Sequence, residues 1–189
     1  VKQLLIYYKH LNDPATGLLW HAYDESGKQT WADPKDHHSA EHWARAIGWY
    51  AMAIVDVLDH LPKDNPKRPE LIAILNRTMT ALRKVQDKKT GLWWLILDMP
   101  EKKGNYFEAS ASCMFTYALA KGVRMGYLPQ SFMKSANAAW TGIQKEFVEN
   151  KGGEVNLLKT IGGAGLGGTP YRDGTFEYYV GEKLVTNDP

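Results

Sequence analysis

The chain has 189 residues, of which 44% are hydrophobic and 23% are charged, and these values are typical of a folded globular domain with one core. Its 23 Lys and Arg residues nearly balance its 21 Asp and Glu residues, so the net charge is only +2, and no basic surface for nucleic acid is indicated. No stretch is long and apolar enough to cross a membrane, and no secretion-signal pattern opens the sequence, so neither a membrane nor a nucleic acid is expected as a partner.

The first segment, residues 1–11, carries an amphipathic helical pattern. Leu4, Leu5, Tyr8 and Leu11 recur on one side of a helix. Because this pattern starts at Val1 without an initiator methionine, we expect the chain to be a fragment whose upstream part is missing. The sequence gives no cellular address.

Four further helices are predicted from apolar periodicity and boundary signals. The first covers residues 39–61, with Ser39 as its N-cap and Pro62 as its stop. The others cover about 69–86, 108–125 and 130–149. Cys113 lies in the third of these four and is the only cysteine, which excludes an intramolecular disulfide and favours a buried apolar role for this thiol.

Two segments between the helices match each other. The second begins 74 positions after the first, at Asp87 against Asp13. The matched residues are Asp13, Thr16, Gly17, Leu18, Trp20 and Asp24 in the first copy and Asp87, Thr90, Gly91, Leu92, Trp94 and Asp98 in the second. Each copy follows a helix and leads to another, so the repeat unit is about two helices, and all copies should lie at one end of a ring or solenoid. A third copy from Lys151 is too weak to count alone.

The last part of the chain, residues 161–189, is rich in glycine and then in aromatic residues, without a helical period. It is expected to form ordered loop and short strand. It also holds a third candidate set, Arg172, Asp173, Glu177, Tyr178 and Tyr179, but Asp173-Gly174 before an alternating run favours a hairpin that covers the fold. The glycines do not match a phosphate-binding loop, because GxxxxGK[ST] is absent. No cofactor is therefore expected.

The first candidate site follows from the first copy of the repeat. Trp20, His21, Asp24 and Trp31 lie on or after its turn, and Trp43 and Arg45 lie at the start of the next helix. Trp faces stack on sugar rings, and an Arg fork matches a carboxylate, so the set suits a sugar acid. Two alternatives stay open: Trp43 fits the apolar face of its helix as a core residue, and ideal helical geometry would point Trp43 and Arg45 about 200° apart.

A second candidate set surrounds Glu108 at the start of the predicted helix 108–125, with Asn105, Tyr106, Ser110 and Ser112. Glu108 could bind a hydroxyl at the mouth of a ring, or it could simply favour the positive end of the helix dipole. His37, His38 and His42 have a spacing that brings imidazoles together, but no Cys or carboxylate completes a known ligand pattern. Surface or capping histidines are the favoured interpretation, and no metal is expected.

Five stretches together give the chain a resemblance to known enzymes. TGLLWHAYD, EHWARAIGWYAMAIVDVLDHLP, QDKKTGLWW, GNYFEASAS and RDGTFEYYVGEKLVTNDP occur in this order over nearly the whole chain. In this it resembles the unsaturated glucuronyl and unsaturated rhamnogalacturonyl hydrolases of glycoside hydrolase families 88 and 105, and more closely the latter. The resemblance implies an all-α fold of the six-hairpin α/α-toroid type, with residues 1–189 as the C-terminal part of one domain and about half of the ring.

The resemblance also implies a chemistry. The substrates would be pectin-derived oligosaccharides of rhamnogalacturonan type that end in a 4,5-unsaturated uronic acid, released by hydration of the vinyl ether. His21, Trp43 and Arg45 match the family's active-site histidine and its WxR pair, and Trp20 and Glu108 are expected beside them in substrate binding. The family's catalytic aspartate would lie upstream of Val1, so no catalytic residue is expected within this chain.

Other functions stay possible on the sequence alone. One is another α/α-barrel sugar enzyme, such as a sugar epimerase or a glucoamylase-like hydrolase, although HWxR together with GNYFEAS argues against it. Another is a non-catalytic carbohydrate-binding half-barrel. In either case an incomplete ring would expose apolar helix faces, so self-association is expected as a possible partner interaction.

Overall fold

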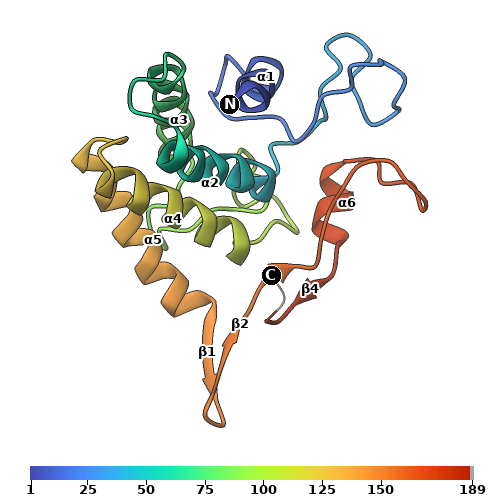
Figure 1. Cartoon of the computed structure of the whole chain (residues 1–189). Coiled ribbons are helices and arrows are strands. Elements are labelled where there is room, and N and C mark those ends of the chain that lie inside the picture. Colours follow the sequence, from blue (N-terminus) through green and yellow to red (C-terminus); the bar gives the residue numbers. More distant parts are fainter. Residues whose placement is uncertain (188–189) are drawn as a thin grey trace.

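The computed structural model describes residues 1–187 and is mainly helical (Figure 1). Its helices are α1 (Lys2–Leu11), α2 (Ala44–His60), α3 (Arg68–Lys84), α4 (Ala109–Arg124), the 3-10 turn η1 (Gln130–Phe132), α5 (Met133–Glu146) and α6 (Phe176–Gly181). Its strands are β1 (Val148–Lys151), β2 (Glu154–Leu157), β3 (Thr160–Ile161) and β4 (Leu184–Val185). Within the described residues, none of these helices has the length and apolar character that a membrane crossing needs.

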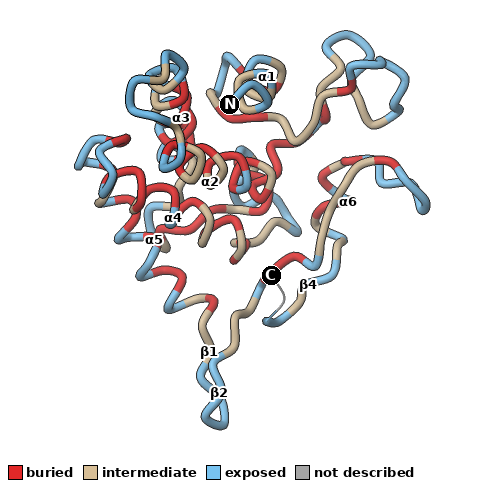
Figure 2. The backbone as a smooth tube through the Cα atoms, viewed as in Figure 1, coloured by how far each residue is buried: buried red, intermediate tan, exposed pale blue. Residues whose placement is uncertain are grey.

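The long helices pack in pairs around the centre of the molecule. Helices α2 and α4 lie side by side, α3 packs on α2, and α5 packs on α4 (Figure 1). Figure 2 shows that the buried segments concentrate where these helices meet. The expectation of a purely α-helical chain is wrong, because the structure also contains two small antiparallel sheets, β1 with β2 and β3 with β4. The chain after α5 is extended and reverses direction at the left-handed Gly152 and Gly153, which pairs β1 with β2.

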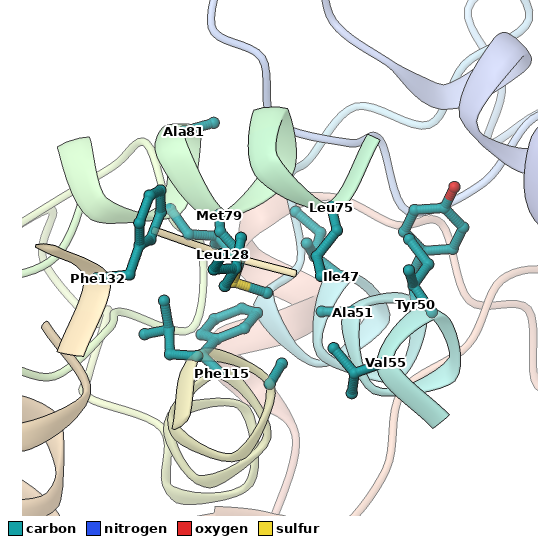
Figure 3. Close-up of a cluster of buried hydrophobic side chains, with 14 of the residues drawn as sticks. Ile47, Tyr50, Ala51, Val55, Leu75, Met79, Ala81, Phe115, Leu128 and Phe132 are labelled. Atoms are coloured by element: carbon teal, nitrogen blue, oxygen red, sulfur yellow. The ribbon is translucent and has the colours of Figure 1, made fainter. Parts of the chain in front are cut away.

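The core joins three helices through residues at helical spacing. Ile47 and Ala51 of α2, Leu75 and Met79 of α3 and Phe115 of α4 form part of one buried cluster (Figure 3). Each is fully shielded from solvent, and burial of a side chain of Leu or Phe size contributes roughly 1.5–3 kcal/mol. The apolar stripes that predict these helices therefore do form the core.

The two copies of the sequence repeat have the same local structure. Gly17 N–H donates to the Asp13 carbonyl at 2.8 Å, and Gly91 N–H donates to the Asp87 carbonyl at 2.8 Å. Both glycines are left-handed, with φ of 77° and 75°, which a side chain would disfavour. In each copy the aspartate carboxylate also accepts from the threonine hydroxyl. The repeat thus encodes one turn, used twice.

The start of α2 differs from the prediction. Ser39 does not cap the helix, because its hydroxyl accepts from the Ala22 N–H at 3.0 Å and its backbone bridges to Ala32. Residues before Ala44 stay extended, and Trp43, the N-cap, has φ −70° and ψ 120° and pairs with Ile96. The 200° separation expected between Trp43 and Arg45 therefore does not apply, since only Arg45 is helical.

The C-terminal segment also differs from the prediction. Asp173-Gly174 leads into a helix, α6, rather than a hairpin. The Thr175 hydroxyl accepts from the Tyr178 N–H at 3.2 Å and caps this helix, while Phe176 and Tyr179, three residues apart, are buried on one side. Residues 148–157, which include the start of the weak third copy at Lys151, form the β1–β2 hairpin. Residues 188–189 of the predicted tail lie outside the described residues.

Candidate functional site

Three aromatic side chains from distant parts of the chain meet beside the start of α2. The His21 ring lies 4.7 Å from the Trp43 ring and 5.8 Å from the Tyr179 ring, and Trp43 stacks on Tyr179 at 5.7 Å between centroids. His21 Nδ1 lies 2.5 Å from the Tyr179 hydroxyl. The loop after the first repeat turn, the N-cap of α2 and the helix α6 thus build one cluster, the His21 cluster (His21, Trp43 and Tyr179).

Burial sets the ionisation of this cluster. It lowers the pKa of His21 from its ordinary value of 6.5 to about 4, and it raises the pKa of Tyr179 above its ordinary value, with Tyr178, Glu41 and Asp173 adding to the rise. Both side chains are therefore neutral at neutral pH. The cluster presents hydrogen-bonding groups and ring faces rather than charge.

His21 opens onto two neighbouring pockets. One, of about 690 Å³, lies between α1 and the segment from His21 to Glu25, and the other, of about 380 Å³, is lined by Trp43, Trp49 and Tyr50 of the α2 region. Tyr7 lines both. Among the lining residues within 1–187, Glu25 is the only acid. An aromatic hollow with one imidazole suits the apolar face and the hydroxyls of a sugar ring.

Arg45 and Glu108 lie beneath the cluster and bind each other. Arg45 Nη2 lies 3.5 Å from Glu108 Oε1, Arg45 Nε donates to the Ser110 hydroxyl at 2.8 Å, and Arg45 Nη2 donates to the Ile161 carbonyl. The Arg45 Cζ atom is 5.8 Å from the centre of the Trp43 ring. Both residues are buried, so this ion pair packs against Trp43 on the side of the protein interior.

Glu108 is the N-cap of α4 and is wholly buried. Its carboxylate accepts from the N–H groups of Ser110 at 3.2 Å, Ala111 at 2.7 Å and Ile161 at 3.1 Å. These contacts bear out the interpretation of Glu108 as a carboxylate at the positive end of a helix. Its expected contact with substrate stays a prediction.

Trp20 does not join the His21 cluster. Side chains alternate along the extended segment, so Trp20 points to the opposite face from His21, stacking on His42 at 4.0 Å. With Trp31 it lines a separate pocket of about 370 Å³. Asp24 is likewise occupied, because its carboxylate accepts from the N–H groups of the loop at Lys28 and Gln29.

Two of the three histidines near Ser39 are hydrogen-bonded through their rings to other parts of the chain. His38 Nε2 lies 2.6 Å from the His10 carbonyl, and His42 Nδ1 lies 3.0 Å from the Asp98 carboxylate. His37 lies at a left-handed position of the loop, with φ of 64°. Across residues 1–187 there is no group of three or more His, Cys, Asp or Glu side chains arranged to hold a metal ion.

Comparison with known families gives the site its context. A family model for Glycosyl Hydrolase Family 88 matches residues 1–189. The chain belongs to this family. A glycoside hydrolase of family 105 from C. acetobutylicum ATCC 824 has the same structure over 99% of the chain, with a TM-score of 0.97 and 48% identity. The α/α toroid expected from the sequence, which is the fold of families 88 and 105, is supported by the mainly helical structure and by this neighbour.

This family 88 chain covers very different shares of two sequence relatives. Protein Atu3128 from Agrobacterium fabrum is 40% identical over 94% of the chain and 78% of its own length. The unsaturated rhamnogalacturonyl hydrolase YesR from Bacillus subtilis is 34% identical over 58% of the chain and 28% of its own length. The chain spans about half, 52%, of the C. acetobutylicum structure.

The stability of this family 88 chain is expected to depend on pH through His21. The pKa of His21 is about 4 in the folded state against 6.5 ordinarily, so between these values the unfolded chain binds more protons, and stability rises with pH across that window. At most about 3 kcal/mol of the free energy of unfolding is lost as the pH falls through it. Urea unfolding of the parent and of His21→Asn should show their difference shrinking towards acid pH. A difference that stays constant would contradict the burial of a neutral His21.

The sequence indicates His21, Trp43 and Arg45 as one candidate site and places Tyr179 in a separate set with Tyr178, but it does not connect Tyr179 or Tyr7 with His21. Tyr179 lies 158 positions after His21, and no spacing rule connects them. Tyr7 was placed only within an amphipathic segment, where it stacks on Tyr50 at 4.6 Å. The spacing of Phe176 and Tyr179, three residues apart, is the one sequence sign that this segment forms a helix with an apolar face.

Proposed function

We propose that the protein to which this chain belongs is a glycoside hydrolase that releases 4,5-unsaturated uronic acid from pectin-derived, rhamnogalacturonan-type oligosaccharides. The observation that carries the proposal is the His21 cluster, an aromatic hollow with a neutral imidazole at its edge. The specific substrate is supported by the similarity to a hydrolase named for unsaturated rhamnogalacturonyl substrates.

In the proposed reaction a carboxylic acid donates a proton to C4 of the vinyl ether, and water adds at C5. The water gives its own proton back to the carboxylate, so the acid is restored. The hemiketal that results opens and releases the remaining sugar. One group acts as acid and then as base, which requires a pKa suited to both roles.

We propose that this carboxyl group comes from outside the chain. The support is that Glu25, an exposed loop residue, is the only acid among the described residues that line the two pockets at His21. The other half of the C. acetobutylicum structure has no counterpart among these residues, since the chain covers 52% of it.

The substrate-binding roles follow from position. Trp43 would stack on the unsaturated ring, and His21 would hydrogen-bond one of its oxygens. Arg45 would act on the sugar acid through Trp43 and through the field of its guanidinium, with Glu108 holding it in place. Trp20 would contribute from the neighbouring pocket that it shares with Trp31.

We also propose that the chain forms about half of a six-hairpin toroid and can associate with a second half-ring. The support is that Trp49 of α2 and Tyr117 of α4 are 58% and 40% exposed, although both lie on the two central helices. Exposed aromatic area of this kind favours association. Size-exclusion chromatography should show a species larger than 21.3 kDa, and a clean monomer would count against pairing of half-rings.

A non-catalytic carbohydrate-binding half-barrel is the second candidate. The scarcity of acids among the described residues that line the two His21 pockets also favours this candidate. Under this alternative the chain would bind saturated and unsaturated sugars alike.

Calorimetric titration with an unsaturated galacturonyl-rhamnose disaccharide and its saturated counterpart separates the two candidates. We expect the unsaturated sugar to bind more tightly, and His21→Asn to weaken its binding by about threefold to tenfold, the value of one hydrogen bond. Trp140→Phe, at an exposed position of α5, is the control and should bind as the parent does. Equal affinity for the two sugars would favour the binding module.

A further inference from the structure

Tyr179 belongs to the His21 cluster although it lies 158 positions after His21 in the chain. It lies on α6, is fully buried, and its hydroxyl meets His21 Nδ1 at 2.5 Å. Two contacts just before Tyr179 hold helix α6: the Thr175 cap, and the Tyr178 hydroxyl, which accepts from the Gly165 N–H at 3.0 Å. The Tyr179 oxygen is therefore held at a defined place beside the imidazole.

The direction of this hydrogen bond follows from the available partners. A neutral imidazole has one N–H donor and one acceptor nitrogen. If Nδ1 carried the proton and donated it, the Tyr179 hydroxyl would need a different acceptor, and within residues 1–187 it has no hydrogen-bond partner except His21. A buried hydroxyl proton without an acceptor is disfavoured. The tyrosine is therefore the donor and Nδ1 is the acceptor.

The neighbouring acids do not offer Tyr179 an alternative. Glu41 and Asp173 are close enough to raise its pKa, but the Asp173 carboxylate is occupied by Thr175. Glu41 Oε2 is buried without any hydrogen-bond partner, Tyr179 included. The phenol thus keeps its proton and directs it to His21.

We propose that Tyr179 is a positioning residue that fixes the tautomer of His21, so that Nε2 carries the proton and faces the pocket as a hydrogen-bond donor. With Nδ1 occupied, Nε2 is the ring nitrogen left for a ligand in the hollow that His21 shares with Trp43. A fixed donor there selects an oxygen acceptor, such as a carboxylate, hydroxyl or ring oxygen of the sugar. The inference rests on the proposed function only for the identity of this ligand.

The tautomer can be measured directly by long-range nitrogen–proton correlation NMR of the imidazole rings. His21→Asn identifies the His21 signals by their loss. The parent protein should show Nδ1 as the unprotonated nitrogen and Nε2 as the protonated one. Tyr179→Phe should move both nitrogen shifts towards a mixture of tautomers. Tyr171→Phe, which removes an exposed hydroxyl that bonds to Thr30 and lies outside the His21 cluster, should leave them unchanged.

A protonated Nδ1 in the parent, or unchanged His21 shifts in a folded Tyr179→Phe, would overturn the proposal. The disaccharide titration gives a second readout: Tyr179→Phe should weaken binding by about threefold to tenfold, and Tyr171→Phe should not. If the tautomer behaves as expected while the parent binds no unsaturated disaccharide, the proposed function fails and the role of Tyr179 stands.

Discussion

Glu108→Gln is expected to lower the free energy of unfolding by about 3–5 kcal/mol, the usual loss when one partner of a buried ion pair is removed. The Glu108 carboxylate accepts hydrogen bonds from the N–H groups of Ser110, Ala111 and Ile161, and its Oε1 atom lies 3.5 Å from Arg45 Nη2. An amide of the same shape would turn an NH2 group towards these donors and leave the Arg45 charge without its counterion. Urea unfolding followed by circular dichroism measures the loss.

Glu70→Gln is the matched control for this substitution. Glu70 pairs with Lys67 at 3.1 Å on α3, and both side chains are at least half exposed, so the control should change stability by less than about 1 kcal/mol. Equal effects of Glu108→Gln and Glu70→Gln would mean that the buried pair does not stabilise the junction of α2 with the start of α4. The same pair supports Trp43, so its loss should also disturb the His21 cluster.

Gly91→Ala is expected to lower the free energy of unfolding by about 2–4 kcal/mol, from backbone strain and overpacking together. Gly91 closes the second repeat turn with a φ of +75°, and a Cβ atom there would lie 2.5 Å from the Ala138 carbonyl oxygen and 3.0 Å from the Ala139 nitrogen. These are backbone atoms of α5, and they cannot move away by a change of side-chain rotamer. Thermal and urea unfolding both report the effect.

Gly126→Ala separates the two contributions. Gly126 has nearly the same φ, +74°, with nothing within 4 Å of the added Cβ, so this substitution carries only the conformational cost of about 1 kcal/mol. Gly91→Ala should therefore be the more damaging of the two. If they were equally damaging, the repeat turn would not be packed against α5 as described.

The sequence predicts the parts of this fold that local rules govern. Apart from the start of α2, the long helices begin and end within a few residues of their expected bounds, because apolar spacing, Pro62 and Gly126 act on neighbouring residues. The repeat was also predictable, since the same aspartate, threonine and glycine make the same hydrogen bonds in both copies.

The remaining features depend on contacts between distant segments. Ser39 is a good N-cap residue by type, but the Ala22 N–H competes for its hydroxyl. Trp20 and Trp94 match in sequence, yet Trp20 stacks on His42, while the Trp94 ring lies tilted against Phe107 at 4.2 Å between centroids. The bond between His21 and Tyr179 joins positions 158 residues apart, and only the folded chain reveals it.

The central claim is that these residues form the substrate-binding half of an unsaturated uronyl hydrolase whose proton donor lies in the other half of the ring. The most direct test follows the ultraviolet absorbance of the conjugated double bond in unsaturated galacturonyl-rhamnose. It compares the chain alone with a fusion in which the unmatched half of the C. acetobutylicum relative precedes it, a design that the TM-score of 0.97 supports. We predict that only the fusion consumes the double bond, and that His21→Asn slows it by about a hundredfold. Consumption by the chain alone, or a folded fusion that leaves the double bond intact, would contradict this account.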